Sequence, residues 1–115
     1  MDIESIREYC LLKPGVTEAF PFDNETLVFK VIKMFLIIGL NNSGFMNVKC
    51  DPEEAILLRE EYEEVQPGYH MNKAHWNTVN ITGRLTDKQL KKMIDNSYDL
   101  VVKSLPKNKR AILSQ

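Results

Sequence analysis

The sequence has few of the residues that mark secreted, disulfide-linked or membrane-spanning chains. Its 115 residues include two cysteines, Cys10 and Cys50, which are too few for a disulfide framework and lack metal-site spacing. The longest apolar run, Met34–Leu40, is too short to span a bilayer. The first four residues give no basic region followed by an apolar run, so we expect no signal peptide. These shortages favour a cytoplasmic protein with reduced, buried thiols and no membrane contact.

Signatures of catalysis and of cofactor binding are also missing. The sequence has no Gly-x-Ser-x-Gly motif, no active-site cysteine signature and no glycine-rich phosphate loop. Its two histidines, His70 and His75, are five residues apart, which is neither helical metal spacing nor a zinc pattern, although a turn between them would let them converge. We therefore expect no enzyme activity, no cofactor and no metal centre.

Charge is nearly balanced overall but is unevenly distributed along the chain. The formal net charge is −1 at pH 7, which argues against a strongly basic nucleic-acid binder. Residues 51–68 hold seven acids and one arginine, whereas residues 69–115 hold nine Lys or Arg and three Asp. Part of the chain can thus present a positive surface, although ordinary solvated helix faces give the same pattern.

Helix-start signals occur at three places. Asp2 can cap a first helix, Asp51-Pro52 opens a second that should end before Pro67, and a capping box begins at Thr86. The helix behind Thr86 carries the longest amphipathic stripe of the chain.

Apolar alternation and continuous apolar runs predict four strands, at residues 26–31, 34–40, 45–50 and 76–81. Residues 16–24 are expected to be irregular. Ile32-Lys33 is expected to be a tight turn, although neither residue favours the positive φ of such turns. The order of elements predicts a single α+β domain over residues 1–115, with an antiparallel sheet and helices packed on one face.

The segment Pro67–Val79 concentrates side chains that stack, donate and accept hydrogen bonds. It contains both histidines, the only tryptophan, a tyrosine, two asparagines and a lysine. If Val79 points inward, strand alternation places Trp76 on the opposite face, to which Lys30 and Lys49 also belong. Such a face would stack bases and contact phosphates.

A nucleic-acid-binding surface is therefore predicted, with cations at phosphates and Trp76 and the histidines near bases or sugars. The candidate residues are Lys30, Lys49, His70, Asn72, Lys73, His75, Trp76, Asn77 and Arg84. The alternative is that Trp76 is a large buried anchor, and that His75 and Asn77 hold the loop through backbone hydrogen bonds.

Three segments resemble the MmcQ/YjbR family. They are Lys-Cys-Asp-Pro-Glu at 49–53, Pro-Gly-Tyr-His-Met-Asn-Lys-Ala-His-Trp-Asn-Thr-Val at 67–79, and Ile-Asp-Asn-Ser-Tyr-Asp-Leu-Val at 94–101. The resemblance implies a CyaY-like, double-wing α+β fold and DNA binding, and it supplies no catalytic residues. We expect a monomer that binds DNA weakly, with an affinity that falls as salt rises because phosphate contacts drive it. The sequence departs from the family at Val31-Ile32, where members commonly place a glycine before the lysine.

Two other functions are compatible with the resemblance. One is a protein-interaction or regulatory domain that uses the Trp76 face of the sheet. The other is metal binding through the acidic run Asp51–Glu64, because the frataxin-like fold also hosts iron on acidic surfaces.

Overall fold

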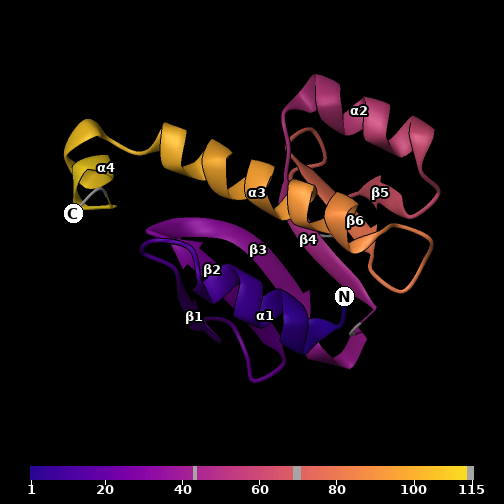
Figure 1. The fold of residues 1–115 in the computed structure, drawn as a ribbon, viewed down its shortest axis with the longest axis horizontal. Coiled ribbons are helices and arrows are strands. Elements are labelled where there is room, and N and C mark those ends of the chain that lie inside the picture. The colour runs from indigo at the N-terminus through magenta and orange to yellow at the C-terminus, as the bar shows by residue number, and fades with distance from the viewer. Residues whose placement is uncertain (43, 69–70, 114–115) are drawn as a thin grey trace.

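A computed structural model describes residues 1–42, 44–68 and 71–113 of the chain, and it confirms the predicted α+β class (Figure 1). The helices are α1 (Ile3–Leu11), α2 (Pro52–Glu61), α3 (Asp87–Ser104) and α4 (Lys107–Leu113), with a 3-10 turn at Leu40–Asn42. The strands are β1 (Thr17–Ala19), β2 (Thr26–Val31), β3 (Lys33–Gly39), β4 (Phe45–Lys49), β5 (Val65–Pro67) and β6 (Trp76–Asn80). They form one antiparallel sheet in the order β1-β2-β3-β4-β6-β5.

The helices begin where their capping residues predict. The Asp2 carboxylate accepts a hydrogen bond from the backbone N of Ser5, 2.8 Å away, at the start of α1. Asp51 caps α2, and Pro52 occupies its first turn. Thr86 and Gln89 form the predicted capping box of α3. Local hydrogen bonds of this kind satisfy free N–H groups without help from the rest of the chain, which explains why the sequence alone locates them.

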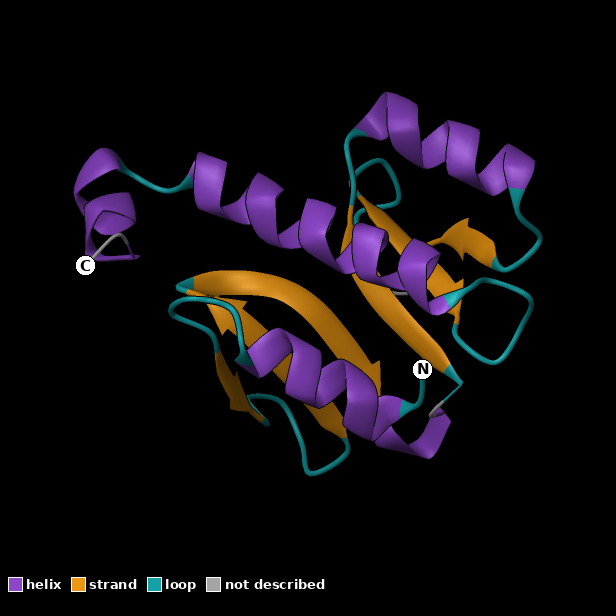
Figure 2. Ribbon diagram, in the orientation of Figure 1, coloured by secondary structure: helices purple, strands orange, loops and turns teal. Residues whose placement is uncertain are grey.

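One face of the sheet, here called the covered face, packs against α1, α2 and α3 (Figure 2). Ile6 of α1 and Ile94 of α3 are fully buried in the core cluster together with strand residues such as Phe29 and Met46. Leu58 of α2 also packs against this cluster. Among the described residues, no helix is both long and apolar enough to span a membrane.

The opposite face, here called the open face, is identified by strand pairing. Val28 pairs with Ile37, Ile37 with Asn47, and Asn47 with Thr78, so these side chains lie in one row across four strands. Directly paired residues share a face, and the residues two positions away along each strand share it as well. Val28 and Ile37, on β2 and β3, are buried, whereas Asn47 and Thr78, on β4 and β6, are partly exposed.

Two short edge strands were not predicted. β1 lies within residues 16–24, which were expected to be irregular, and β5 lies where α2 was expected to continue. Each has three residues and a single partner strand, so it has no alternation of its own to detect. α2 ends at Glu61 because Tyr62 has extended dihedral angles.

The β2–β3 hairpin turns at Ile32. Ile32 has a φ of 69°. Among the residues that the structure describes, no other non-glycine residue has a positive φ. This conformation costs a β-branched residue on the order of 1–2 kcal/mol. The predicted Ile32-Lys33 turn is therefore centred on Ile32, since Lys33 already pairs with Val31. The residue keeps 45% of its surface exposed, so burial offsets only part of this cost.

Candidate nucleic-acid interface

The open face carries lysines and no acids. Lys30 lies two residues from Val28, and Lys49 lies two residues from Asn47, so both belong to this face, as strand alternation predicts. Both side chains are partly exposed. None of the strand residues on this face is Asp or Glu. The polar strand residues here are Thr17, Thr26, Lys30, Asn47, Lys49, Gln66, Thr78 and Asn80.

Neighbouring polar side chains on this face are ordered by one another. The Thr78 hydroxyl donates to the Asn47 side-chain oxygen at 2.5 Å, across the β4–β6 pair. The backbone N of Lys49 donates to the buried hydroxyl of Ser97 on α3 at 2.8 Å, and that hydroxyl in turn donates to the Phe35 carbonyl oxygen. The strand end that presents Lys49 is thus fixed from the covered side by α3.

Trp76 shares the open face, yet its side chain is only 8% exposed. Its partner across the sheet is Lys49, but its carbonyl accepts a hydrogen bond from Gly68 N at 2.8 Å. A Cβ atom added to Gly68 would lie 2.7 Å from Trp76 Cβ, so the backbone packs directly on this residue. This burial corrects the expectation of an exposed stacking platform and supports the anchoring role. It also removes the observation on which a protein-interaction surface centred on Trp76 would depend.

Arg59 of α2 holds the segment 67–79 in place. Its Nε donates to the Asn77 side-chain oxygen at 2.7 Å, and its Nη2 donates to the carbonyl oxygens of Lys73 and, at 3.3 Å, Trp76. Asn77 pairs with Val48 on the covered face and is 1% exposed. Asn77 was predicted to meet a ligand, and the structure instead makes it a buried partner of Arg59.

The turn before β6 is organised by its own backbone. The carbonyl of Asn72 accepts from the backbone N of His75 at 3.2 Å and of Trp76 at 3.0 Å, while its side chain accepts from Ala74 N at 2.9 Å. The His75 carbonyl accepts from Cys50 N at 2.7 Å. The side chains of Lys73 and His75 are exposed. Asn72 is exposed as well, so three candidate residues of this turn remain available to a ligand, and His70 lies outside the described residues.

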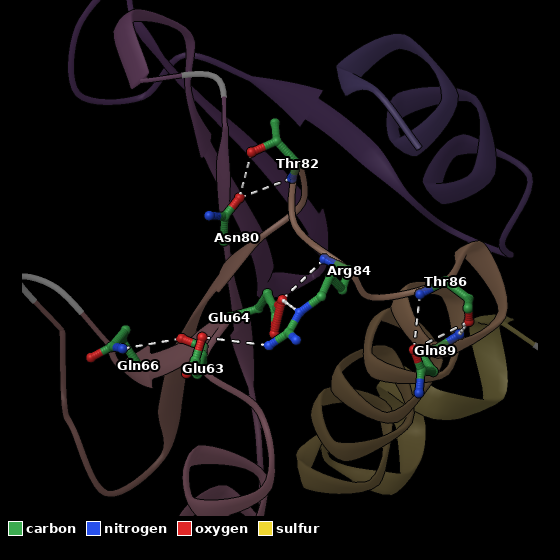
Figure 3. Close-up of polar contacts among 8 residues, drawn as sticks. All are labelled: Glu63, Glu64, Gln66, Asn80, Thr82, Arg84, Thr86 and Gln89. Atoms are coloured by element: carbon green, nitrogen blue, oxygen red, sulfur yellow. Dashed lines mark hydrogen bonds and ion pairs between the residues drawn. The ribbon is translucent and has the colours of Figure 1, made fainter.

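Arg84 is not near the other predicted cations. Trp76 begins β6, whereas Arg84 follows the far end of that strand. Figure 3 shows its side chain directed at Glu63 and Glu64, with ion-pair distances of 3.4 and 3.5 Å. Its backbone N also donates to Glu64 at 3.0 Å, and this bond helps to hold the pKa of the Glu64 carboxyl below its usual value. The structure therefore separates Arg84 from the surface of Lys30 and Lys49.

Comparison with known proteins places this geometry in a family. The YjbR family model matches residues 11–100. The chain belongs to the YjbR family. It is 36% identical over 117 residues to the uncharacterized protein YjbR of Escherichia coli strain K12, covering 100% of this chain and 99% of the relative. It is also 36% identical over 106 residues to the uncharacterized protein YbdF of Escherichia coli O157:H7, covering 90% of this chain and 87% of that one.

Solved structures share the YjbR-family fold. A Deinococcus radiodurans protein with a DUF419 domain aligns with a TM-score of 0.90 and 34% identity, over 98% of this chain and 88% of that one. A Pseudomonas syringae protein aligns with a TM-score of 0.73 and 27% identity, over 87% of this chain and 98% of that one. The recognition of the family from its sequence segments is thus confirmed.

The two thiols of this YjbR-family chain are buried, and burial raises the pKa of Cys10 to about 12 and that of Cys50 to about 11, from a usual value of 9.0. Glu54 and Asp51 add to the effect at Cys50. Cys50 also lines a shallow pocket of about 270 Å³ between the start of α2 and α3. A thiol with a raised pKa is a poor nucleophile at neutral pH.

We expect slow labelling of both thiols by a disulfide reagent at pH 8, and rapid labelling after unfolding in urea. Because the folded pKa values lie above the unfolded one, the stability they contribute is complete below about pH 9 and is lost as the pH rises toward 11 to 12. Urea midpoints measured across this range should fall. Stoichiometric labelling of a thiol in the folded protein within the mixing time would contradict the prediction, and Cys50→Ala identifies which thiol reacts.

The acidic run does not assemble a metal centre in the part of the chain that the structure describes. Within residues 1–42, 44–68 and 71–113, no group of three or more His, Cys, Asp or Glu side chains is close enough to hold an ion. Glu53, Glu54, Glu60 and Glu61 are exposed along α2. These acids have the solvated, helix-start role that their positions also predict.

Sequence reasoning missed Arg59 and the exposed phenylalanines Phe20 and Phe22. Arg59 is the only cation among residues 51–68, and a lone arginine among seven acids is a signal that could have singled it out. Phe20 and Phe22 are 46% and 67% exposed in the β1–β2 connection. The Phe-Pro-Phe sequence in a turn-rich stretch was the available signal for these two rings.

Proposed function

We propose that this YjbR-family chain is a non-enzymatic, cytoplasmic DNA-binding protein that uses the open face of its sheet. The observation that carries the proposal is the absence of acidic residues among the strand residues of the open face. The open face presents Lys30 and Lys49 without a single acidic strand residue, whereas the acids of α2 lie on the covered side. A polyanion can therefore approach these strands without meeting the acids of α2.

The chemistry of the open face supports contact with the DNA backbone. Lys30 and Lys49 supply ammonium groups for phosphates. The Asn47 side chain, whose oxygen already accepts from Thr78, supplies amide N–H groups of the kind that donate to phosphate and sugar oxygens. Trp76 is too buried to stack on a base. We therefore propose binding that depends on phosphate and is weak in sequence preference.

The test is a fluorescence anisotropy titration of a labelled duplex at several salt concentrations. Binding driven by phosphate contacts requires affinity that falls steeply with salt, by a slope of about 0.9 in log–log units for each phosphate neutralised. Two to four such contacts predict a slope of roughly −2 to −4. Absence of binding at low salt would overturn the proposal, and binding that is independent of salt would overturn the proposed mode.

A further inference from the structure

Several exposed cations and one exposed isoleucine lie together at one end of the molecule. Here the hairpin tip, defined as Lys30–Met34, lies beside α4 (Figures 1 and 2). Gly15 joins the two, since a Cβ atom placed on it would clash with Leu113 of α4 and would lie 3.9 Å from Val31 of β2. Leu113 also packs against the core cluster, so α4 is docked onto the domain next to the tip.

The cations of the hairpin tip and α4 are free of acidic partners. Lys33, Lys107, Lys109 and Arg110 are exposed, and none of them forms an ion pair with a described residue. Neither the hairpin tip nor α4 contains an Asp or Glu. Lys30 belongs to both the tip and the open face, so the basic surface continues from this end onto the sheet.

Ile32 is the residue that protrudes from the tip. It holds a left-handed φ of 69° that glycine or asparagine would adopt with less strain, and its side chain is 45% exposed. Packing within the domain therefore offsets only part of the cost of an isoleucine at this position. Strain retained at an exposed site motivates a search for a binding role.

We propose that the hairpin tip and α4 grip duplex DNA, with Ile32 wedged into the minor groove and the four cations on the flanking phosphates. This inference rests on the proposed function and specifies how the duplex is held. Apolar wedges flanked by Lys and Arg part base steps and bend the duplex in other minor-groove binders. An anionic lipid surface would also attract cations beside an aliphatic side chain. Duplex DNA is favoured because the surface continues into Lys30 and Asn47, whose ammonium and amide N–H groups suit phosphate and sugar rather than acyl chains.

The decisive variant is Ile32→Gly, which removes the wedge and relieves the strained backbone at once. We expect its melting temperature to equal or exceed that of the wild type, while duplex affinity falls about tenfold and DNA bending, read by energy transfer between end labels, decreases. Ile56→Ala is the matched control, since Ile56 is also an exposed isoleucine (52%) but lies on α2, outside the proposed DNA surface, and it should bind and bend as the wild type does.

The outcomes separate this inference from the proposed function. Wild-type affinity and bending in Ile32→Gly would overturn the wedge, and the proposed function would stand if removal of Lys30 and Lys49 still weakened binding. A wild-type protein that binds no duplex would overturn both. Binding to phosphatidylserine vesicles, abolished by Ile32→Gly, together with unchanged duplex binding would assign the tip to a membrane surface and overturn the inference alone.

Discussion

Replacement of Arg59 by alanine is expected to lower the free energy of unfolding by about 3 kcal/mol, since a hydrogen bond to a charged group contributes about 1.5–3 kcal/mol and a buried partner left unpaired is costly. Arg59 donates to the Asn77 side chain and to the carbonyls of Lys73 and Trp76. Asn77 is 1% exposed, so water cannot readily replace the lost donor. Urea denaturation followed by far-UV circular dichroism measures the change.

Arg84→Ala is the matched control for this prediction. It removes the same type of side chain, but Arg84 is 80% exposed and its partner Glu63 is 90% exposed, so that contact is solvent-screened. The Glu64 side chain is only 9% exposed, but it keeps the hydrogen bond from the backbone N of residue 84 in the variant. Its denaturation midpoint should therefore stay close to that of the wild type. Equal midpoints for Arg59→Ala and the wild type would show that α2 does not hold the segment 67–79, and the structural account of that segment would fail.

The Lys30→Ala, Lys49→Ala double variant is expected to weaken duplex binding by roughly ten- to a hundredfold at moderate salt. It should also reduce the magnitude of the salt slope by about 2, because each lysine that neutralises a phosphate contributes about 0.9. Both side chains are partly exposed on the open face, so the fold should be retained. Anisotropy titrations at three or more salt concentrations measure both quantities.

A charge-matched control separates the face from the total charge. Lys88 and Lys92 are exposed on α3, which packs on the covered face, so Lys88→Ala, Lys92→Ala removes the same charge from the other side. That variant should bind with nearly wild-type affinity and slope. Equal losses in the two double variants would mean that net charge, and no particular face, governs binding.

Local chemistry explains what the sequence could predict. The caps at Asp2, Asp51 and Thr86 depend on neighbours within three residues. The longer strands can be predicted because apolar side chains alternate along them with a period of about two residues. The same alternation correctly assigned Lys30 and Lys49 to one face. Strand alternation could not predict how deeply a side chain is buried. For Trp76, burial depends on the close approach of the Gly68 backbone.

Contacts between distant residues explain what the sequence could not predict. Arg59 and Asn77 are 18 residues apart, and an arginine in an acidic helix ordinarily indicates a solvated charge. The edge strands β1 and β5 exist only through pairing with β2 and β6. Within the segment 67–79, backbone hydrogen bonds join Gly68 to Trp76 and Asn72 to both His75 and Trp76, whereas Lys30 and Lys49 lie on other strands.

Backbone amide chemical shifts recorded during titration with a duplex test the central claim most directly. Binding through the open face and the hairpin tip predicts perturbations at Lys30, Lys33, Asn47, Lys49 and Thr78, with little change along α2. Perturbations concentrated on α2 and the covered side, with β2 and β4 unchanged, would contradict it.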